Sequence, residues 1–220
     1  MQKILLLCCL GLPIAAQAQF NEFKEGSYVL SSDGSRHTGE LKLRDYQLLI
    51  VRNHQGKNLK LTPDEVATFH LANEHYITLK QAGLPGPSTL FKVDADKEKV
   101  VFVQQVDSGR VMLLRYTYSQ AMAPTMGGGG AMMGGGSTAV SRYLLRFADS
   151  PDLTVVEHTG LGGGNKNFRT LLRPYLVARP DLLKLLDEKL LTESMLPDLI
   201  HALNTGTPYV PPARYGPATY

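Results

Sequence analysis

Short apolar segments separated by turn residues recur roughly every 8 to 12 residues between residues 26 and 158. Residues 40–44 alternate between polar and apolar side chains, which is the period-two pattern of a strand buried on one face. Residues 48–51 are continuously apolar and predict a strand that is covered on both faces. This spacing favours a small barrel or a sandwich-like antiparallel meander. We therefore expect a β-rich domain over residues 19–158.

Two clusters of turn residues predict how some of these strands are joined. The segment Thr62-Pro63-Asp64-Glu65 predicts a single helical turn, with Thr62 as its cap and Pro63 in its first position. The segment Asp107-Ser108-Gly109 predicts a hairpin between strands at 99–106 and 110–119.

Two glycine-rich segments interrupt the strand pattern. Residues 81–88 contain two glycines and two prolines and predict a loop, which leaves open a division into sub-units at 26–80 and 89–158. Residues 121–137 contain seven glycines and four methionines. Fixing so many glycines in a regular element costs much chain entropy, so this segment predicts a mobile loop.

From residue 165 the apolar residues follow a helical period. One stripe is formed by Phe168, Leu171, Leu172, Tyr175 and Leu176. Because proline cannot donate its backbone N–H, Pro174 should kink or end this helix near Arg173. The prediction is an α+β fold, mainly antiparallel β, with a C-terminal bundle of two or three short helices over residues 165–206.

Two further helices are expected before the chain ends. One starts at Pro180, and the next is capped by Ser194 with Pro197 in its first turn. Gly206 stands just past the end of the last helix, where a left-handed residue commonly stops a helix. Four prolines in residues 207–220 predict an extended or disordered tail.

The N-terminus has the three parts of a secretion signal. Lys3 supplies a positive charge, residues 4–14 are mainly apolar, and Ala16-Gln17-Ala18 matches a small-x-small cleavage site. The apolar run is shorter than the roughly 20 residues of a membrane-spanning helix. We expect a signal peptide over residues 1–18, a mature chain starting near Gln19 and no integral membrane span after cleavage.

Cys8 and Cys9 leave lipidation open as an alternative, because a lipoprotein signal also ends at a cysteine. Leu6 and Leu7 stand where such a signal has small residues, so an ordinary cleavable signal is favoured. Cleavage after residue 18 would remove both cysteines and leave the mature chain without disulfide or thiol chemistry.

The charge pattern argues against nucleic-acid binding. Removal of Lys3 lowers the 23 basic residues to 22, against 20 acidic residues, which gives a mature charge of +2. The basic residues are scattered, with no run of five or six that would follow a phosphate backbone. Trp, a common anchor at sugar and protein interfaces, is absent.

The sequence of residues 155–167 partly matches the pattern of strand, glycine-rich loop and helix that is typical of a phosphate-binding site. A P-loop needs a glycine before its lysine and a hydroxyl residue after it, whereas Lys166 stands between Asn165 and Asn167. The glycines at 160–164 also lack the dinucleotide-binding spacing. A plain flexible connection is favoured, and no cofactor is assigned.

Two groups of residues could bind a metal. The methionines of the 121–137 loop (Met122, Met126, Met132 and Met133) offer soft sulfur to Cu(I), but no histidine lies between His75 and His158. His70 and His75 flank a predicted turn at 72–74 and could approach each other across a hairpin, although ordinary strand histidines are favoured. The six histidines lack the H-x-x-x-H spacing of a helical zinc pair, and no metal ligand is assigned.

No residue pattern indicates catalysis. Asp94, Asp96, Asp152 and Glu157 are candidate carboxylates for acid–base chemistry, but nothing in their spacing marks a pair. The G-x-S-x-G nucleophile motif is absent, and Ser35 and Ser108 are interpreted as turn residues. We assign no catalytic residue and expect a protein that is not an enzyme.

Several segments resemble the N-terminal β-module of secreted Gram-negative proteins that carry a domain of unknown function. They are residues 26–29 (GSYV), 33–34 (DG), 38–41 (TGEL) and 58–66 (NLKLTPDEV), followed by Phe69. The resemblance implies an envelope location and a non-enzymatic character, and it supplies no catalytic residues. The glycine–methionine insert departs from the pattern. By fold-level analogy alone, residues 26–79 are similar to SH3-like small barrels.

Export, balanced charge and the lack of a reactive motif favour a non-catalytic cell-envelope protein. We expect it in the periplasm or associated with the outer membrane, with an extracellular location left open. It would act as an interaction or scaffold module for an envelope protein through its β-surface and tail. The alternatives are a hydrolase of envelope polysaccharide or peptide and a copper-binding protein that uses the methionine loop.

Overall fold

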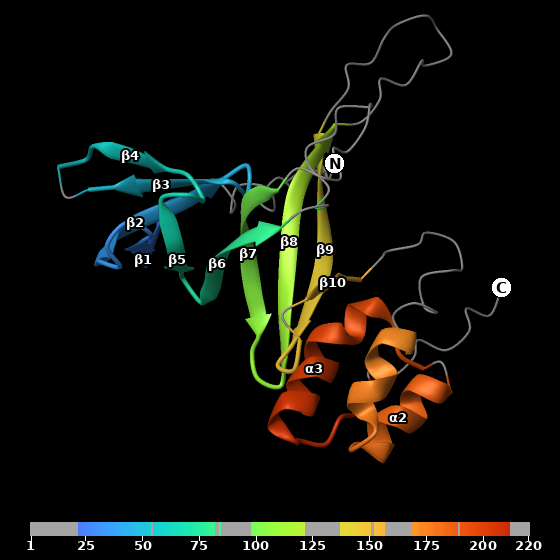
Figure 1. Cartoon of the computed structure of the whole chain (residues 1–220). Helices are drawn as coiled ribbons and strands as arrows, with labels where there is room; N and C mark the ends of the chain where they lie inside the picture. The colour runs from blue at the N-terminus through green and yellow to red at the C-terminus, as the bar shows by residue number, and fades with distance from the viewer. Residues whose placement is uncertain are drawn as a thin grey trace, which may run out of the picture.

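The computed structural model describes residues 22–53, 55–81, 84, 98–121, 137–150, 152–156, 169–188 and 190–211 of the 220-residue chain. Ten antiparallel strands form one sheet in the order β10-β9-β8-β7-β6-β5-β1-β2-β3-β4 (Figure 1). The strands are β1 (Lys24–Leu30), β2 (Arg36–Arg44), β3 (Leu48–Arg52), β4 (Asn58–Leu61), β5 (Val66–Leu71), β6 (Glu74–Gln81), β7 (Lys99–Asp107), β8 (Val111–Ala121), β9 (Ser137–Phe147) and β10 (Leu153–Val155). The expected α+β fold, mainly antiparallel with short C-terminal helices, is confirmed.

Several predicted features lie outside the described residues. These are the signal peptide at 1–18, residues 122–136 of the glycine–methionine loop, the segment 157–168 and the end of the tail at 212–220. The sequence left open a division into sub-units at 26–80 and 89–158. In the structure, β6 of the first segment pairs with β7 of the second from His75 to Gln81. Both segments therefore contribute to the same sheet.

Strands β1 to β5 form the first half of the sheet and enclose a core of aromatic and aliphatic side chains. In Figure 1 strands β3 and β4 run across the direction of β7, β8 and β9, so the sheet turns strongly along its width. The buried members of this core are Tyr28, Leu41, Leu49, Val51, Leu61, Val66, Phe69 and Phe102. Leu49, Ile50 and Val51 are all buried, which confirms the strand predicted to be covered on both faces.

The chain does turn between β4 and β5 where predicted, but as a hydrogen-bonded turn over residues 63–65 and not as a helical turn capped by the Thr62 side chain. The Glu65 carboxylate accepts hydrogen bonds from the Thr62 backbone N–H at 2.7 Å and from its hydroxyl at 2.8 Å. These two bonds to Thr62 lower the pKa of Glu65. The reciprocal bond runs from Glu65 N–H to the Thr62 carbonyl at 3.1 Å, so the turn closes on itself.

The strands β7, β8 and β9 serve two different cores, because alternate residues of a strand point to opposite faces. We call the face that carries Phe102 and Leu113 the helix face. At one end of the sheet this face packs under the C-terminal helices through Val111, Leu113, Leu145 and Phe147. The opposite face buries Leu84, Val101, Val103, Leu114, Tyr116, Tyr118 and Leu144.

Within the described part of the C-terminal segment, the bounded elements are η2 (Arg173–Leu176), α2 (Pro180–Asp187), η3 (Glu193–Met195) and α3 (Leu196–Thr205), where η marks a 3-10 turn. Residues 169–172 are helical and pass directly into η2, where Pro174 stands at the start. The predicted helix end near Arg173 is therefore confirmed as a change to 3-10 form. The second helix starts at Pro180, as expected.

The predicted Ser194 cap is wrong. Ser194 lies inside η3, and its hydroxyl is 2.9 Å from that of Thr192. The residue before α3 is Met195, which makes no side-chain capping bond, because η3 already brings the chain into a helical turn there. Gly206 ends α3 with φ of 74°, and its N–H bonds the Ala202 carbonyl, as predicted for a left-handed stop.

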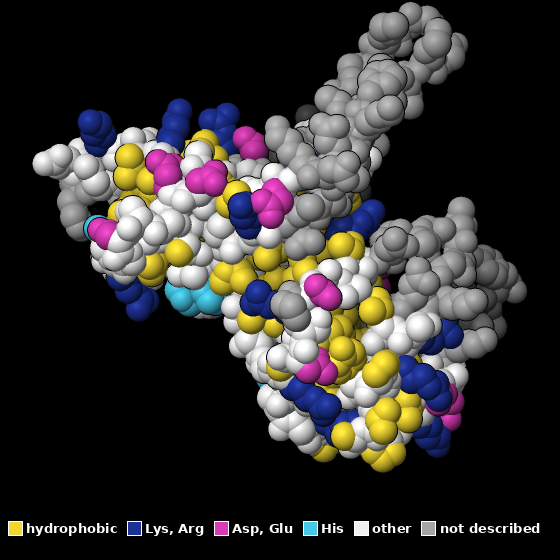
Figure 2. Space-filling view, in the orientation of Figure 1, with side chains coloured by type: hydrophobic (Ala, Val, Ile, Leu, Met, Phe, Trp, Pro, Cys, Tyr) yellow, Lys and Arg dark blue, Asp and Glu magenta, His cyan; other side chains and the backbone are white. Residues whose placement is uncertain are grey.

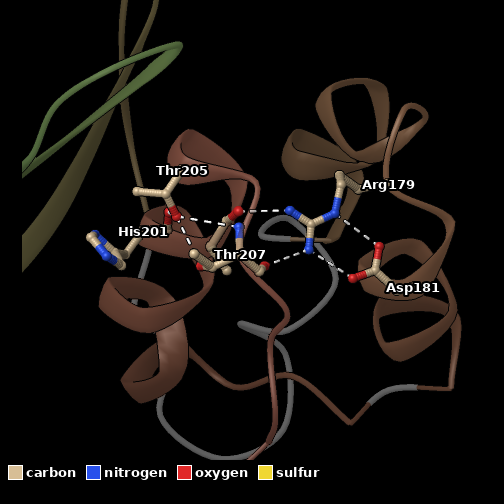
Figure 3. A network of polar contacts seen from close by, with 6 residues as sticks. Arg179, Asp181, His201, Thr205 and Thr207 are labelled. Carbon is tan, nitrogen blue, oxygen red and sulfur yellow. Dashed lines mark hydrogen bonds and ion pairs between the residues drawn. The ribbon is translucent and has the colours of Figure 1, made fainter.

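Arg179 holds the end of α3 against the start of α2. Its guanidinium donates to both carboxylate oxygens of Asp181, at 2.9 and 2.7 Å, and to the Ala202 carbonyl at 2.6 Å (Figure 3). It also donates to the Thr207 carbonyl at 2.9 Å. One side chain thus fixes the first residues after α3, so the tail leaves from a defined point.

Candidate functional site

Directly opposed residues on neighbouring strands form a row across the helix face. In the sheet register Phe69 on β5 opposes Tyr76 on β6, Tyr76 opposes Gln104 on β7, and Gln104 opposes Arg115 on β8. Opposed side chains of antiparallel strands lie close enough to interact. The row changes from aromatic to polar along its length, since the Phe69 and Tyr76 rings stack with centroids 4.5 Å apart.

Glu74 joins the polar end of this row into a hydrogen-bonded network. The Tyr76 hydroxyl donates to Glu74 Oε2 at 2.9 Å, and Gln104 Nε2 donates to Glu74 Oε1 at 3.2 Å. Arg115 Nε donates to Gln104 Oε1 at 2.8 Å, and an Arg115 terminal nitrogen bonds the same oxygen. The Arg115 guanidinium also lies 3.8 Å from Glu74 Oε1. Each member of the network therefore orients the next.

The environment keeps the Tyr76 hydroxyl protonated. Burial is the main cause that raises the pKa of Tyr76 well above its usual value, and the neighbouring Glu74 carboxylate adds to it. Tyr76 therefore acts as a permanent donor to Glu74. The side chains of Arg115 and Glu74 are 39% and 44% exposed, so their charged groups reach solvent and can meet a ligand.

This network lies in a cleft of about 430 Å³ on the helix face, which we call the Tyr76 cleft. Its walls come from the start of β1, the end of β2, the β2–β3 turn and strands β5 to β9. The lining residues are Glu22, Lys24, Leu43, Tyr46, Leu71, Glu74, Tyr76, Phe102, Gln104, Arg115, Thr117, Ala139 and Ser141. Apolar and aromatic side chains thus lie beside a small set of oriented polar groups, as in many ligand sites.

The β2–β3 turn brings Tyr46 to the cleft through an uncommon backbone. Asp45 and Tyr46 have φ of 50° and 60°, a left-handed conformation that side chains other than glycine adopt at a cost of roughly 1–2 kcal/mol each. The next residue, Gln47, accepts a hydrogen bond from Phe102 N–H on β7 at 3.2 Å. This contact ties the turn to the second half of the sheet and so holds it at the cleft.

A second hollow, of about 790 Å³, lies over β1, β2 and β3. Glu25 and Glu40 are opposed in the sheet register here, and Arg52 pairs with Glu40 at 3.3 Å. The Arg52 guanidinium also lies 3.8 Å from the Phe23 ring centre. Both carboxylates are exposed, so the hollow lacks the enclosed setting in which acid–base pairs usually work.

Ser35 contacts both an aspartate and a histidine, but the bonding is that of a turn. Asp33 Oδ1 accepts from the Ser35 N–H at 2.9 Å and lies 2.7 Å from its hydroxyl, while His37 Nε2 lies 2.8 Å from the hydroxyl. These bonds to Ser35 lower the pKa of Asp33. In a catalytic triad the carboxylate orients the histidine, whereas here it binds the serine.

His70 and His75 meet across the β5–β6 hairpin. They are opposed in the register, and their rings stack with centroids 4.3 Å apart and planes 7° from parallel. The predicted approach of these two histidines is therefore confirmed. They point away from the helix face, because their strand neighbours Phe69 and Tyr76 point into it.

The remaining sequence candidates do not gather at the cleft. Asp152 is exposed beside β10. Ser108 is exposed in the β7–β8 turn, which supports its interpretation as a turn residue. The other candidates lie outside the described residues: Asp94, Asp96, Glu157, Lys166, the glycines at 160–164 and the four loop methionines. Within the described ranges, no three His, Cys, Asp or Glu side chains gather in a way that could hold a metal ion.

Comparison with protein-family models, curated proteins and solved structures found no match to this chain. In the described part of the chain, no helix has both the length and the apolar character needed to cross a membrane. The face drawn in Figure 2 carries basic and acidic side chains interspersed over the first half of the sheet.

Sequence reasoning missed the Tyr76 cleft. Gln104 and Arg115 belong to the two strands of one hairpin, but Glu74 lies on β6, which is distant along the chain, and only the β6–β7 register brings it to them. A partial signal was present, because Gln104 and Arg115 are polar residues inside otherwise apolar strand segments. Such positions indicate a polar site on one sheet face once the strand order is known.

Proposed function

We propose that this protein is a non-catalytic cell-envelope protein that binds an envelope protein partner through the Tyr76 cleft. The observation that carries the proposal is the oriented network of Glu74, Gln104 and Arg115 beside the aromatic side chain of Tyr76. A network fixed before binding lowers the ordering cost that a ligand must meet. The exported location rests on the N-terminal signal pattern of residues 1–18.

The chemistry of the cleft supports binding more than catalysis. Both Glu74 oxygens already accept hydrogen bonds, from Tyr76 and Gln104, and Arg115 lies beside them. The Glu74 carboxylate is thus engaged by groups of the protein itself. The exposed side of the Arg115 guanidinium remains suited to a carboxylate or amide oxygen of a partner.

The apolar residues of the cleft support a polypeptide as the partner. Leu43 and Leu71 line the cleft beside the buried ring of Phe102. An apolar side chain of a partner would fill this part, while its backbone or carboxylate oxygens meet Arg115. Buried aromatic and arginine anchors of this kind are typical of protein interfaces.

The test is crosslinking in cells followed by affinity purification of the full chain and of Arg115→Met. The matched control is Arg52→Met, because Arg52 forms a similar ion pair with Glu40 in the other hollow and is similarly exposed. We expect wild type and Arg52→Met to recover the same envelope protein and Arg115→Met to lose it. Equal recovery with Arg115→Met, or no envelope protein at all, would contradict the proposal.

A second arm tests whether the tail contributes. Thr207 accepts a hydrogen bond from Arg179, and Tyr209 packs against the helical core, so the first tail residues belong to the fold. A deletion of residues 212–220 therefore removes the tail without removing these contacts. Loss of the partner on this deletion would place part of the contact in the tail.

A further inference from the structure

Two imidazole side chains lie side by side on the sheet face opposite the Tyr76 cleft. His70 on β5 and His75 on β6 are directly opposed, with ring centroids 4.3 Å apart. His70 is exposed and His75 is half-buried. Histidine side chains are visible at the surface of the first half of the sheet in Figure 2.

The nitrogens of this pair are available to a ligand. Neither imidazole has a hydrogen-bond partner among the described residues, whereas His37 and His201 each contact a side-chain oxygen. The residues that oppose the pair on the flanking strands are the neutral Ser27 on β1 and Gln105 on β7. Ser27 Oγ in turn accepts a hydrogen bond from the Arg36 guanidinium at 3.2 Å, so one cation lies beside the residue that opposes His70.

The hairpin sets the two rings in a geometry that a small rotation converts into a chelate. The two rings are nearly parallel with centroids 4.3 Å apart, so both lie within reach of one ion. The terminal torsion of histidine is broad and soft. Rotation of both rings can direct one nitrogen of each toward a common point about 2.0 Å away, a usual metal–imidazole distance. Because the paired strands fix the backbone, only these side-chain torsions need to change.

We propose that His70 and His75 form a two-histidine binding site for a divalent transition metal, with Cu²⁺ as the best-fitting ion. Imidazole suits zinc, copper and nickel, and the order of divalent affinities places Cu²⁺ highest. Cu²⁺ accepts a tetragonal set of nitrogen and oxygen ligands, so water can complete the two protein ligands. Structural zinc sites use four protein ligands, which the described residues do not bring together.

The site is tested by Cu²⁺ titration of the untagged mature chain, followed by calorimetry and by electron paramagnetic resonance. Variants His70→Asn and His75→Asn remove one ligand each, and His37→Asn is the matched control on the helix face. His70→Thr serves as a second variant because threonine suits a strand. Circular dichroism of each variant checks that the sheet is retained.

We expect one Cu²⁺ per chain with two imidazole nitrogens in the copper spectrum. Loss of a supporting group around a metal ligand costs about 10- to 100-fold in affinity, so loss of a ligand should weaken binding at least that much. The control should bind as wild type does. The inference is overturned if the double variant His70→Asn/His75→Asn binds Cu²⁺ as tightly as wild type, or if the spectrum lacks two imidazole nitrogens.

Discussion

The side-chain amide of Asn204 on α3 hydrogen-bonds both backbone polar groups of Val111 on β8. Its Oδ1 accepts from the Val111 N–H at 3.0 Å, and its Nδ2 donates to the Val111 carbonyl at 2.8 Å. The same Nδ2 donates to Asp107 Oδ1 at 2.7 Å, while His201 Nδ1 lies 2.8 Å from Asp107 Oδ2. Two residues on one side of α3 thus fasten the helical end to the β7–β8 hairpin.

Replacement of Asn204 should therefore destabilise the fold. In Asn204→Ala the Val111 backbone groups lose their partners in a partly buried setting, which costs about 1–3 kcal/mol of the free energy of unfolding. Urea denaturation of wild type and variant measures this change. His201→Ala is the control, because its exposed side chain should cost only about 1 kcal/mol or less. Equal losses in the two variants would contradict the account.

Two opposed glycines should differ sharply in their tolerance of alanine. A Cβ on Gly26 would lie 2.2 Å from the His70 carbonyl and 2.7 Å from Leu41, so the β1–β5 pairing would have to move. A Cβ on Gly39 would meet nothing closer than the Arg52 carbonyl at 3.3 Å. We expect Gly26→Ala to cost about 3 kcal/mol or more and Gly39→Ala clearly less. Thermal denaturation of both variants tests the order, and a reversed order would contradict the packing of β1.

The stacked histidines should give a measurable pH dependence. The pKa of His75 is lowered in the folded state, first by burial and then by His70, so the unfolded chain binds the proton more readily. The contribution of His75 to stability is therefore present above its unfolded pKa and is lost as the pH falls through the folded pKa. An NMR titration should show the pKa of His75 rising in His70→Asn, since burial then acts alone. No rise would show that His70 does not act on it.

The ion pair in the Tyr76 cleft should matter little for folding. Arg115 and Glu74 are both well exposed, and exposed pairs contribute about 0–1 kcal/mol. Arg115→Met should therefore unfold at nearly the wild-type urea concentration, which is measured by tyrosine fluorescence. This result would attribute a loss of partner binding to the cleft itself. A loss of several kcal/mol would instead give Arg115 a structural role.

Local patterns in the sequence predicted the elements well, but not their combination. The alternation in residues 40–44 and the change of direction at Thr62 depend on near neighbours. The strand formed as expected, and the chain turns at Thr62, although without the predicted helical form. The Ser194 cap failed because residues 193–195 form a 3-10 turn that leads directly into α3. The pairing of β6 with β7 depends on a register between strands that are distant in sequence, which no local pattern contains.

The candidate sites also differ in whether they depend on local sequence or on long-range strand pairing. His70 and His75 are five residues apart around one turn, so their contact could be expected from the hairpin alone. The Tyr76 network needed the order of β6, β7 and β8, in which Glu74 and Arg115 come from strands separated by β7. The spacing of residues along the chain does not predict a site that is built across several strands in this way.

The most direct test of the interaction proposal is site-specific photo-crosslinking from two adjacent residues of β9. Ala139 lines the Tyr76 cleft, while Thr138 is also exposed but points to the opposite face. A photoreactive residue at position 139 should give one discrete adduct with an envelope protein, and the adduct should be lost with Arg115→Met. Position 138 should give none. Equal adducts from both positions, or no adduct from position 139, would contradict the role of the cleft.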